Sequence, residues 1–228
     1  MKQIPLAIGP ESQPTFDTFI TDGNSAAISH LRAGVSPTTP TYLWGPAGCG
    51  KSHLLRALVH QRQQVGDQAA AFDADDPAPW AAREDCTLVV IDRCERLDAE
   101  RQQAAFVLFL QSAAQGAQWV AAGRVPPVDL PLRDDLRTRL AWGHVFALKP
   151  LAEHETRAVL RRQADQRGIF LGDEVMDYLL TRFARDLKNL MTLLDRLDHY
   201  ALAQQRAVTV PLLRQMLQDE AAADGRAA

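Results

Sequence analysis

The chain has 228 residues, of which 46% are hydrophobic, and it carries a formal net charge of -3 with a pI near 6.1. No stretch reaches the roughly 18 apolar residues of a membrane span, and the N-terminus lacks the pattern of a signal peptide. We therefore expect a cytoplasmic protein with no membrane partner. The absence of a long basic run argues against a surface that coats nucleic acid.

The sequence of residues 1–14 predicts an extended, weakly ordered arm. Its residues 3–8, Gln-Ile-Pro-Leu-Ala-Ile, are apolar and precede a segment rich in Gly and Pro. One interpretation is a terminal strand that packs on the domain. The other is a short linear motif that binds a partner protein through Gln3, Ile4, Leu6 and Ile8.

A hydrophobic elbow, Phe16 to Phe19, then precedes a helix expected from Ser25 to Ala33. Because a nucleotide-binding motif follows it, the elbow is a candidate site for an adenine base.

Residues 45–52, Gly-Pro-Ala-Gly-Cys-Gly-Lys-Ser, fit the phosphate-binding pattern Gly-x-x-x-x-Gly-Lys-Ser. A buried strand ending at Trp44 precedes them and an amphipathic helix follows, which is the context that the motif requires. Glycines allow consecutive amide groups to face an anion, and the helix N-terminus adds partial positive charge. We therefore expect nucleotide phosphates to contact Gly45, Pro46, Ala47, Gly48, Cys49, Gly50, Lys51, Ser52 and His53.

In such a loop, Lys51 would reach the β- and γ-phosphates and the Ser52 hydroxyl would hold Mg²⁺. The alternative is an ordinary Gly-rich turn with a chance Lys-Ser, although the chain contains only four lysines. A second strand is expected from Gln68 to Asp73.

The continuous apolar run from Cys86 to Asp92 is typical of a central parallel strand that ends in a carboxylate. At that edge Asp92 would order Mg²⁺-bound waters beside Ser52, unless it merely begins a turn. Arg93 follows, where many ATPases place a second acid that orients the attacking water. A guanidinium cannot accept a proton from that water, so we expect weak or no intrinsic ATPase activity.

A helix from Ala99 to Ala114 and a strand from Gln118 to Ala122 are expected next. The end of this strand, Ala121-Ala122-Gly123, has no polar side chain, which is a second indication of weak hydrolysis. A short helix at 132–143 and a last strand at 145–148 follow. The arginines of that helix either solvate a surface or include a finger for the phosphate of a neighbouring chain; they are Arg133, Arg137 and Arg139.

Strands and helices alternate up to Pro150, which predicts an α/β domain with a parallel sheet covered on both faces. From Leu151 only helices are expected, at 152–167, 173–182, 186–205 and from Thr209 onwards. The predicted organisation is an arm at 1–14, a nucleotide-binding core at 15–150, a helical lid at 151–220 and a disordered tail at 221–228.

These residues together resemble AAA+ proteins, and within them the family of the bacterial initiator DnaA and its shorter relative Hda, the regulatory inactivator of DnaA. The resemblance covers nearly the whole chain and implies a P-loop core with a parallel sheet and a small all-helical lid. It rests on the phosphate-binding loop and on residues 16–19, 88–92, 123–127, 139–143 and 185–190. Because the chain stops near the end of the lid, without the helix-turn-helix domain of an initiator, we expect the Hda branch.

The resemblance implies a protein that holds ADP or ATP with Mg²⁺ and makes DnaA hydrolyse its ATP, so that replication does not start again. Residues 3–8 resemble the peptide by which Hda-like proteins bind the DNA polymerase sliding clamp, so DNA would be reached indirectly. Arg139 would be the finger supplied in trans. Lys188 occupies a lid position where a nucleotide-sensing arginine is common, and it lacks the bidentate fork of arginine. A homo-oligomer and the identity of the resident nucleotide stay open.

Two other functions fit a phosphate loop followed by a lid. A small-molecule P-loop kinase gives no reason for the segment from Arg139 to Gly143 or for an apolar N-terminal peptide. An autonomous AAA+ ATPase that acts as a loader requires substantial ATPase activity of its own, which Arg93 disfavours.

Overall fold

The computed structural model describes residues 14–20, 23–34, 39–183 and 187–224. The chain divides into two compact units, residues 1–150 and 151–228, and each is described by itself. Within the described ranges, no helix is long and apolar enough to cross a membrane.

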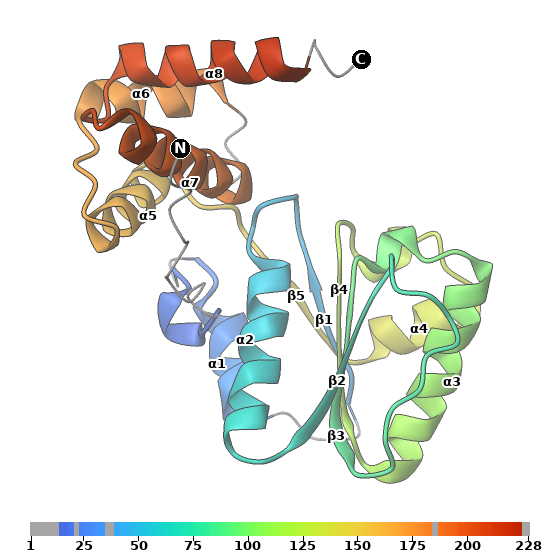
Figure 1. Ribbon diagram of the computed structural model, residues 1–228. Coiled ribbons are helices and arrows are strands. Elements are labelled where there is room, and N and C mark those ends of the chain that lie inside the picture. Colours follow the sequence, from blue (N-terminus) through green and yellow to red (C-terminus); the bar gives the residue numbers. More distant parts are fainter. Residues whose placement is uncertain (1–13, 21–22, 35–38, 184–186, 225–228) are drawn as a thin grey trace. The chain divides into compact units, whose positions relative to one another are not determined.

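The first unit is built on a parallel sheet of five strands in the order β2-β3-β4-β1-β5 (Figure 1). Because all its described strands run in the same direction, their carboxyl ends meet at one edge, where open α/β sheets bind ligands. The strands are β1 (Thr41–Trp44), β2 (Gln68–Asp73), β3 (Cys86–Asp92), β4 (Gln118–Gly123) and β5 (His144–Ala147).

Helices cover both faces of this sheet (Figure 1). One face carries α1 (Ser25–Ala33) and α2 (Lys51–Gln64), and the other carries α3 (Ala99–Gln115) and α4 (Asp134–Trp142). Three short 3-10 helices, which the sequence pattern does not predict, are η1 (Phe16–Thr18), η2 (Cys94–Arg96) and η3 (Pro127–Asp129).

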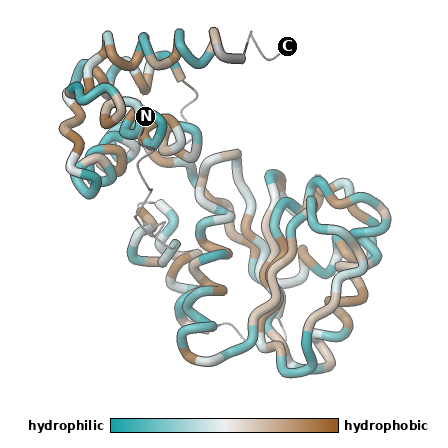
Figure 2. The backbone as a smooth tube through the Cα atoms, viewed as in Figure 1, coloured by the Kyte–Doolittle hydropathy of each residue, from teal (hydrophilic) through white to brown (hydrophobic). Residues whose placement is uncertain are grey.

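Side chains alternate between the two faces along each central strand, as the pleat requires. Leu43 and Val90 pack in the cluster beneath α2, whereas Tyr42, Val89 and Ile91 pack in the cluster beneath α3 and α4. The strands therefore read as continuous apolar runs, which Figure 2 shows as brown segments between the helices. Full burial of one such aliphatic side chain stabilises the fold by roughly 1.5–3 kcal/mol.

The second unit is all-helical in its described residues, with α5 (Glu153–Gln166), α6 (Asp173–Arg182), α7 (Leu187–Gln204) and α8 (Val210–Asp224). Its core gathers apolar residues from each helix, among them Leu160, Met176, Leu194 and Leu213. The expected disorder from residue 221 is wrong for residues 221–224, which continue α8. Alanine has the highest helix propensity, so the Ala-rich stretch extends the helix.

Candidate functional site

The phosphate-type loop connects β1 to α2 at the carboxyl edge of the sheet. Gly45 and Gly50 have φ angles of 153° and 93°, in the region that favours glycine. A Cβ at Gly45 would lie 2.4 Å from the carbonyl oxygen of Leu148, and one at Gly50 would lie 2.4 Å from Cε2 of Phe19. These glycines allow the loop to pack between the end of β5 and the hydrophobic elbow.

Lys51 is the first residue of α2, and its ammonium group lies inside the loop. Its Nζ donates hydrogen bonds of 2.8 Å to the carbonyl oxygens of both Gly45 and Pro46, and it lies 3.5 Å from Sγ of the buried Cys49. Gly50 is the N-cap of α2, and among the described residues no side chain caps this helix. The first amide groups of α2 and the Lys51 ammonium thus provide positive charge at one place, as an anion site requires.

Ser52 and Asp92 line one cavity of about 360 Å³ between α2, β2 and β3. The Asp92 carboxylate accepts a hydrogen bond of 2.8 Å from the Arg93 amide. Hydroxyl and carboxylate oxygens suit Mg²⁺, and the described residues contain no cluster of three His, Cys, Asp or Glu side chains that forms a metal site without further ligands. The pair fits a Mg²⁺ ion that takes its remaining ligands from phosphates and water, as at other phosphate loops.

Arg93 is held by two carboxylates that the sequence reading missed. It has a left-handed conformation with φ of 55°, its Nε donates to Asp73 at 2.8 Å and its Nη2 pairs with Asp75 at 2.6 Å. Asp73 lies opposite Asp92 in the β2–β3 register. The Arg93 side chain is therefore held by Asp73 and Asp75 next to Asp92 in the chain, and it offers no proton acceptor there.

The side chain of Tyr42 occupies the space beside the carboxyl end of β4. A Cβ at Gly123 would lie 2.2 Å from the Tyr42 hydroxyl, which donates a hydrogen bond of 2.9 Å to the Val125 carbonyl oxygen. Burial raises the pKa of Tyr42, so this hydroxyl stays protonated. Ala121 and Ala122 are fully buried, one in each core cluster. No polar side chain of residues 121–123 reaches the site.

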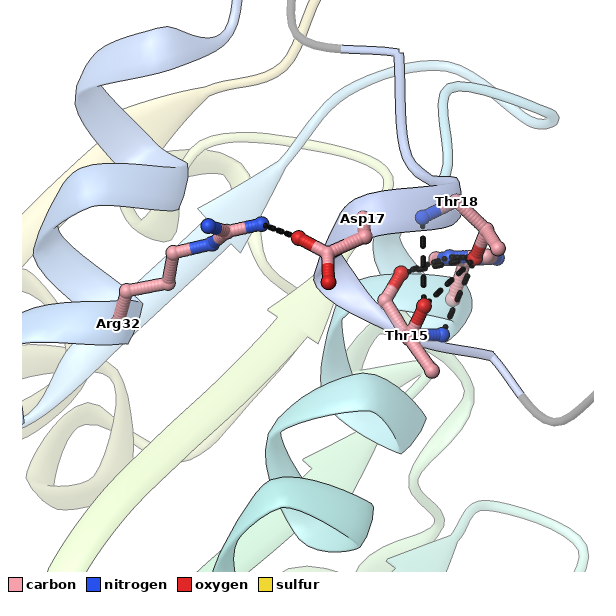
Figure 3. Close-up of polar contacts among 5 residues, drawn as sticks. Thr15, Asp17, Thr18 and Arg32 are labelled. Atoms are coloured by element: carbon pink, nitrogen blue, oxygen red, sulfur yellow. Dashed lines mark hydrogen bonds and ion pairs between the residues drawn. The ribbon is translucent and has the colours of Figure 1, made fainter.

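His53 contacts the elbow rather than the interior of the loop. Its Nε2 lies 2.9 Å from the Thr15 carbonyl oxygen and 3.2 Å from the Thr18 hydroxyl, and burial lowers its pKa. Thr15 and Thr18 also cap η1 reciprocally, and Asp17 of η1 pairs with Arg32 of α1 at 2.6 Å (Figure 3). These contacts anchor the elbow beside the loop, where Phe19 meets Gly50.

The three arginines of the α4 segment differ in their partners. Arg133 pairs with Asp135 at 2.7 Å, and Arg137 pairs with Asp134. Arg139 lies over two rings of α3, with its Cζ 5.3 Å from the centroid of Phe106 and 5.0 Å from that of Phe109. Within the described part of the chain, Arg139 has no hydrogen bond or ion pair.

Arg139 also lies on the other face of the sheet from α2. Leu136 and Leu140 of α4 pack in the cluster with Phe109, whereas Leu54 and Leu58 of α2 pack in the opposite cluster. Ser52 and Asp92 thus line one cavity, Lys51 precedes Ser52 at the start of α2, and Arg139 does not line that cavity.

Some predicted site residues lie outside the described part of the chain. They are Gln3, Ile4, Leu6 and Ile8 of the arm, and the side chain of Lys188.

Comparisons with known proteins agree with this architecture. Residues 153–217 match the family model described as the Hda lid domain. An uncharacterized protein of Haemophilus influenzae is 33% identical over 227 residues, which cover 95% of this chain and 98% of that protein. This similarity extends through both units.

Solved structures of DnaA share the fold. Domain III of the Thermotoga maritima replication initiation protein DnaA superposes with a TM-score of 0.75 at 20% identity, covering 92% of this chain and 97% of that one. AMPPCP-bound DnaA from Aquifex aeolicus gives a TM-score of 0.66 at 20% identity, covering 83% of this chain and 65% of that one. The α/β core with a helical lid predicted from the sequence is confirmed, and the chain belongs to the Hda-like, DnaA-related family of AAA+ proteins.

Proposed function

We propose that this protein regulates the initiation of DNA replication by making the ATP of an initiator of the DnaA type hydrolyse. In this proposal the chain binds ADP or ATP with Mg²⁺ at its own loop and supplies Arg139 to the nucleotide of the initiator. The sliding clamp, bound through residues 3–8, would hold the two proteins together on DNA. A cytoplasmic location belongs to the same proposal.

Nucleotide binding is supported by the charge and shape of the loop. The Lys51 ammonium, the start of α2 and the cavity lined by Ser52 and Asp92 support the binding of a nucleotide with Mg²⁺. The related DnaA of Aquifex aeolicus has a structure with AMPPCP bound. In our proposal, Ser52 holds the metal directly, Asp92 orders its waters, and Lys51 turns from the loop carbonyls to the phosphates.

The observation on which the proposal depends is the set of contacts that Arg139 makes. Of the three arginines in its segment, it alone has no carboxylate partner within the described residues. Its guanidinium donors are available to a phosphate, and a charge of this kind stabilises the transition state of phosphoryl transfer. Arg139 belongs to α4, which packs on the face of the sheet opposite α2, and it does not line the cavity of Ser52 and Asp92. We therefore propose that the phosphate comes from another molecule.

The residues around Asp92 speak against the alternative of an autonomous ATPase. Arg93 takes the position next to Asp92 and is paired with Asp73 and Asp75. Its guanidinium cannot act as the base that activates water. A small-molecule kinase would leave the unpaired Arg139 without a role.

The test is a hydrolysis assay on ATP-loaded DnaA, with and without clamp and DNA. Arg139→Ala should reduce the stimulated rate by about a thousandfold or more, the range of arginine fingers, and leave ADP binding unchanged. Arg137→Ala is the matched control, because it removes an arginine of the same helix that is paired with Asp134. Full stimulation by Arg139→Ala would refute the proposal.

The clamp contact is tested separately. Replacing Gln3 and Leu6 with Ala should abolish clamp binding while ADP binding persists, because these side chains belong to the proposed linear motif. Unchanged clamp affinity would favour the other interpretation, in which the apolar arm is a strand packed on its own domain.

A further inference from the structure

The Arg139 guanidinium is held by an aromatic pair on the neighbouring helix. Phe106 and Phe109 are three residues apart on α3, so their rings share one face of that helix. Arg139 Cζ lies 5.3 Å and 5.0 Å from the two ring centroids, within the range of cation–π attraction.

The two rings differ in their burial and in the residues that they contact. Phe109 is buried and meets Trp119 of β4 edge-on, with centroids 5.2 Å apart and an interplanar angle of 72°. The central strand thus fixes the orientation of Phe109. Phe106 is only half-buried, and its ring also lies 5.2 Å from Cζ of Arg133, whose charge is compensated by Asp135.

We infer that Phe106 and Phe109 are positioning residues that preorganise Arg139 for its action on the partner's nucleotide, an inference that rests on the proposed function. Arginine has many rotamers, and ordering it during the reaction would reduce the rate. The rings restrict the side chain without using its N–H donors. The guanidinium is therefore oriented by the core and remains free to bind phosphate oxygens.

Phe106 allows this inference to be tested without damage to the core, because it is half-buried whereas Phe109 belongs to the buried cluster. Phe106→Leu keeps an apolar side chain and removes the ring. Phe106→Tyr keeps the ring and should behave as wild type. Val107→Ala, at an exposed neighbour on α3, is the control for a general effect of changing this surface.

The first readout needs no partner. ¹⁵N relaxation of the Arg139 Nε–H group, assigned with Arg139→Ala, should show a restricted side chain in the wild type and in Phe106→Tyr. It should show a mobile one in Phe106→Leu. Equal order in Phe106→Leu and wild type would overturn the inference, whatever the function of Arg139.

The second readout is the stimulated hydrolysis of DnaA-bound ATP, titrated with each variant. Phe106→Leu should lower the maximal rate about two- to fivefold, as expected for the loss of one exposed cation–π contact, with an unchanged half-saturating concentration. Phe106→Tyr and Val107→Ala should retain the wild-type maximal rate. A changed half-saturating concentration with an unchanged maximal rate would mean that Phe106 contacts the partner directly, and would overturn the inference.

The two proposals can fail separately. If Arg139→Ala stimulates as well as wild type, the proposed function fails. If Arg139→Ala is inactive and Phe106→Leu equals wild type in rate, only the positioning role fails.

Discussion

Gly123→Ala is predicted to destabilise the first unit strongly although it adds only one methyl group. The added Cβ would lie 2.2 Å from the Tyr42 hydroxyl, which is closer than any non-bonded contact allows, and 3.2 Å from a carboxylate oxygen of Glu95. Tyr42 of β1 is fully buried in the cluster beneath α3 and α4, so its ring cannot swing into solvent. Accommodation therefore requires Tyr42 to move and to give up its hydrogen bond to Val125.

The expected loss of stability has two contributions. An unsatisfied buried partner of the Tyr42–Val125 hydrogen bond costs about 1–3 kcal/mol. Overpacking in a filled core costs about 1–3 kcal/mol more, so the free energy of unfolding should fall by roughly 2–6 kcal/mol. In a Tyr42→Phe background the clashing oxygen is absent, and the added cost of Gly123→Ala should shrink by at least about 1 kcal/mol.

Urea unfolding followed by tryptophan fluorescence measures this effect in the correct unit. The four tryptophans of the chain, Trp44, Trp80, Trp119 and Trp142, all lie in the first unit. Gly116→Ala is the control, because a Cβ there meets no atom within 4 Å and only the positive φ of 70° opposes it, at about 1 kcal/mol. Equal stability of Gly123→Ala and wild type, or strict additivity with Tyr42→Phe, would refute the reasoning.

Three further predictions concern the loop and its surroundings. Lys51→Ala should weaken binding of a fluorescent ADP analogue by about tenfold or more, because a charge-assisted contact to phosphate is lost; unchanged affinity would contradict the proposed role. Arg93→Glu should raise the basal ATPase rate of the isolated protein, and more so together with Asp73→Asn, which removes a repelling carboxylate; flat rates in both variants would count against it. Burial lowers the pKa of His53 below its ordinary 6.5, so its stabilising contribution is full above pH 6.5 and is lost as the pH falls through the lowered value. The urea concentration at the unfolding midpoint should therefore decrease when the pH is lowered from about 7.5 to about 5.5, and His53→Gln should make that decrease smaller.

Most helices and strands follow from the sequence because local signals and tertiary packing agree. The strand at Cys86–Asp92 and the helix at Asp173–Arg182 have the predicted bounds, since an apolar run and an amphipathic stretch each fit one structure. The short turns at Phe16–Thr18, Cys94–Arg96 and Pro127–Asp129 were missed. Their conformations depend on single caps and on packing against distant residues, which no periodicity records.

The candidate site, too, could be predicted from the sequence only in part. The loop and the Asp92 strand carry their chemistry in contiguous residues, so the motif predicts that Ser52 and Asp92 lie close together. The partners of Arg93 could not be found, because Asp73 is twenty positions away in the chain and becomes its neighbour only through the β2–β3 register. The position of Phe106 and Phe109 against Arg139 likewise depends on how α3 and α4 pack together.

The surroundings of Asp92 indicate that Arg93→Glu alone should raise hydrolysis only modestly. Each position where a catalytic group would act is already used by a structural contact: Arg93 pairs with Asp73 and Asp75, and the space at Gly123 is taken by Tyr42. An acid at position 93 would face two carboxylates, and a polar side chain at position 123 would displace a buried ring. Coupled changes should therefore raise hydrolysis in cis more than Arg93→Glu alone, whereas Arg139, which has no carboxylate partner among the described residues, makes none of these contacts.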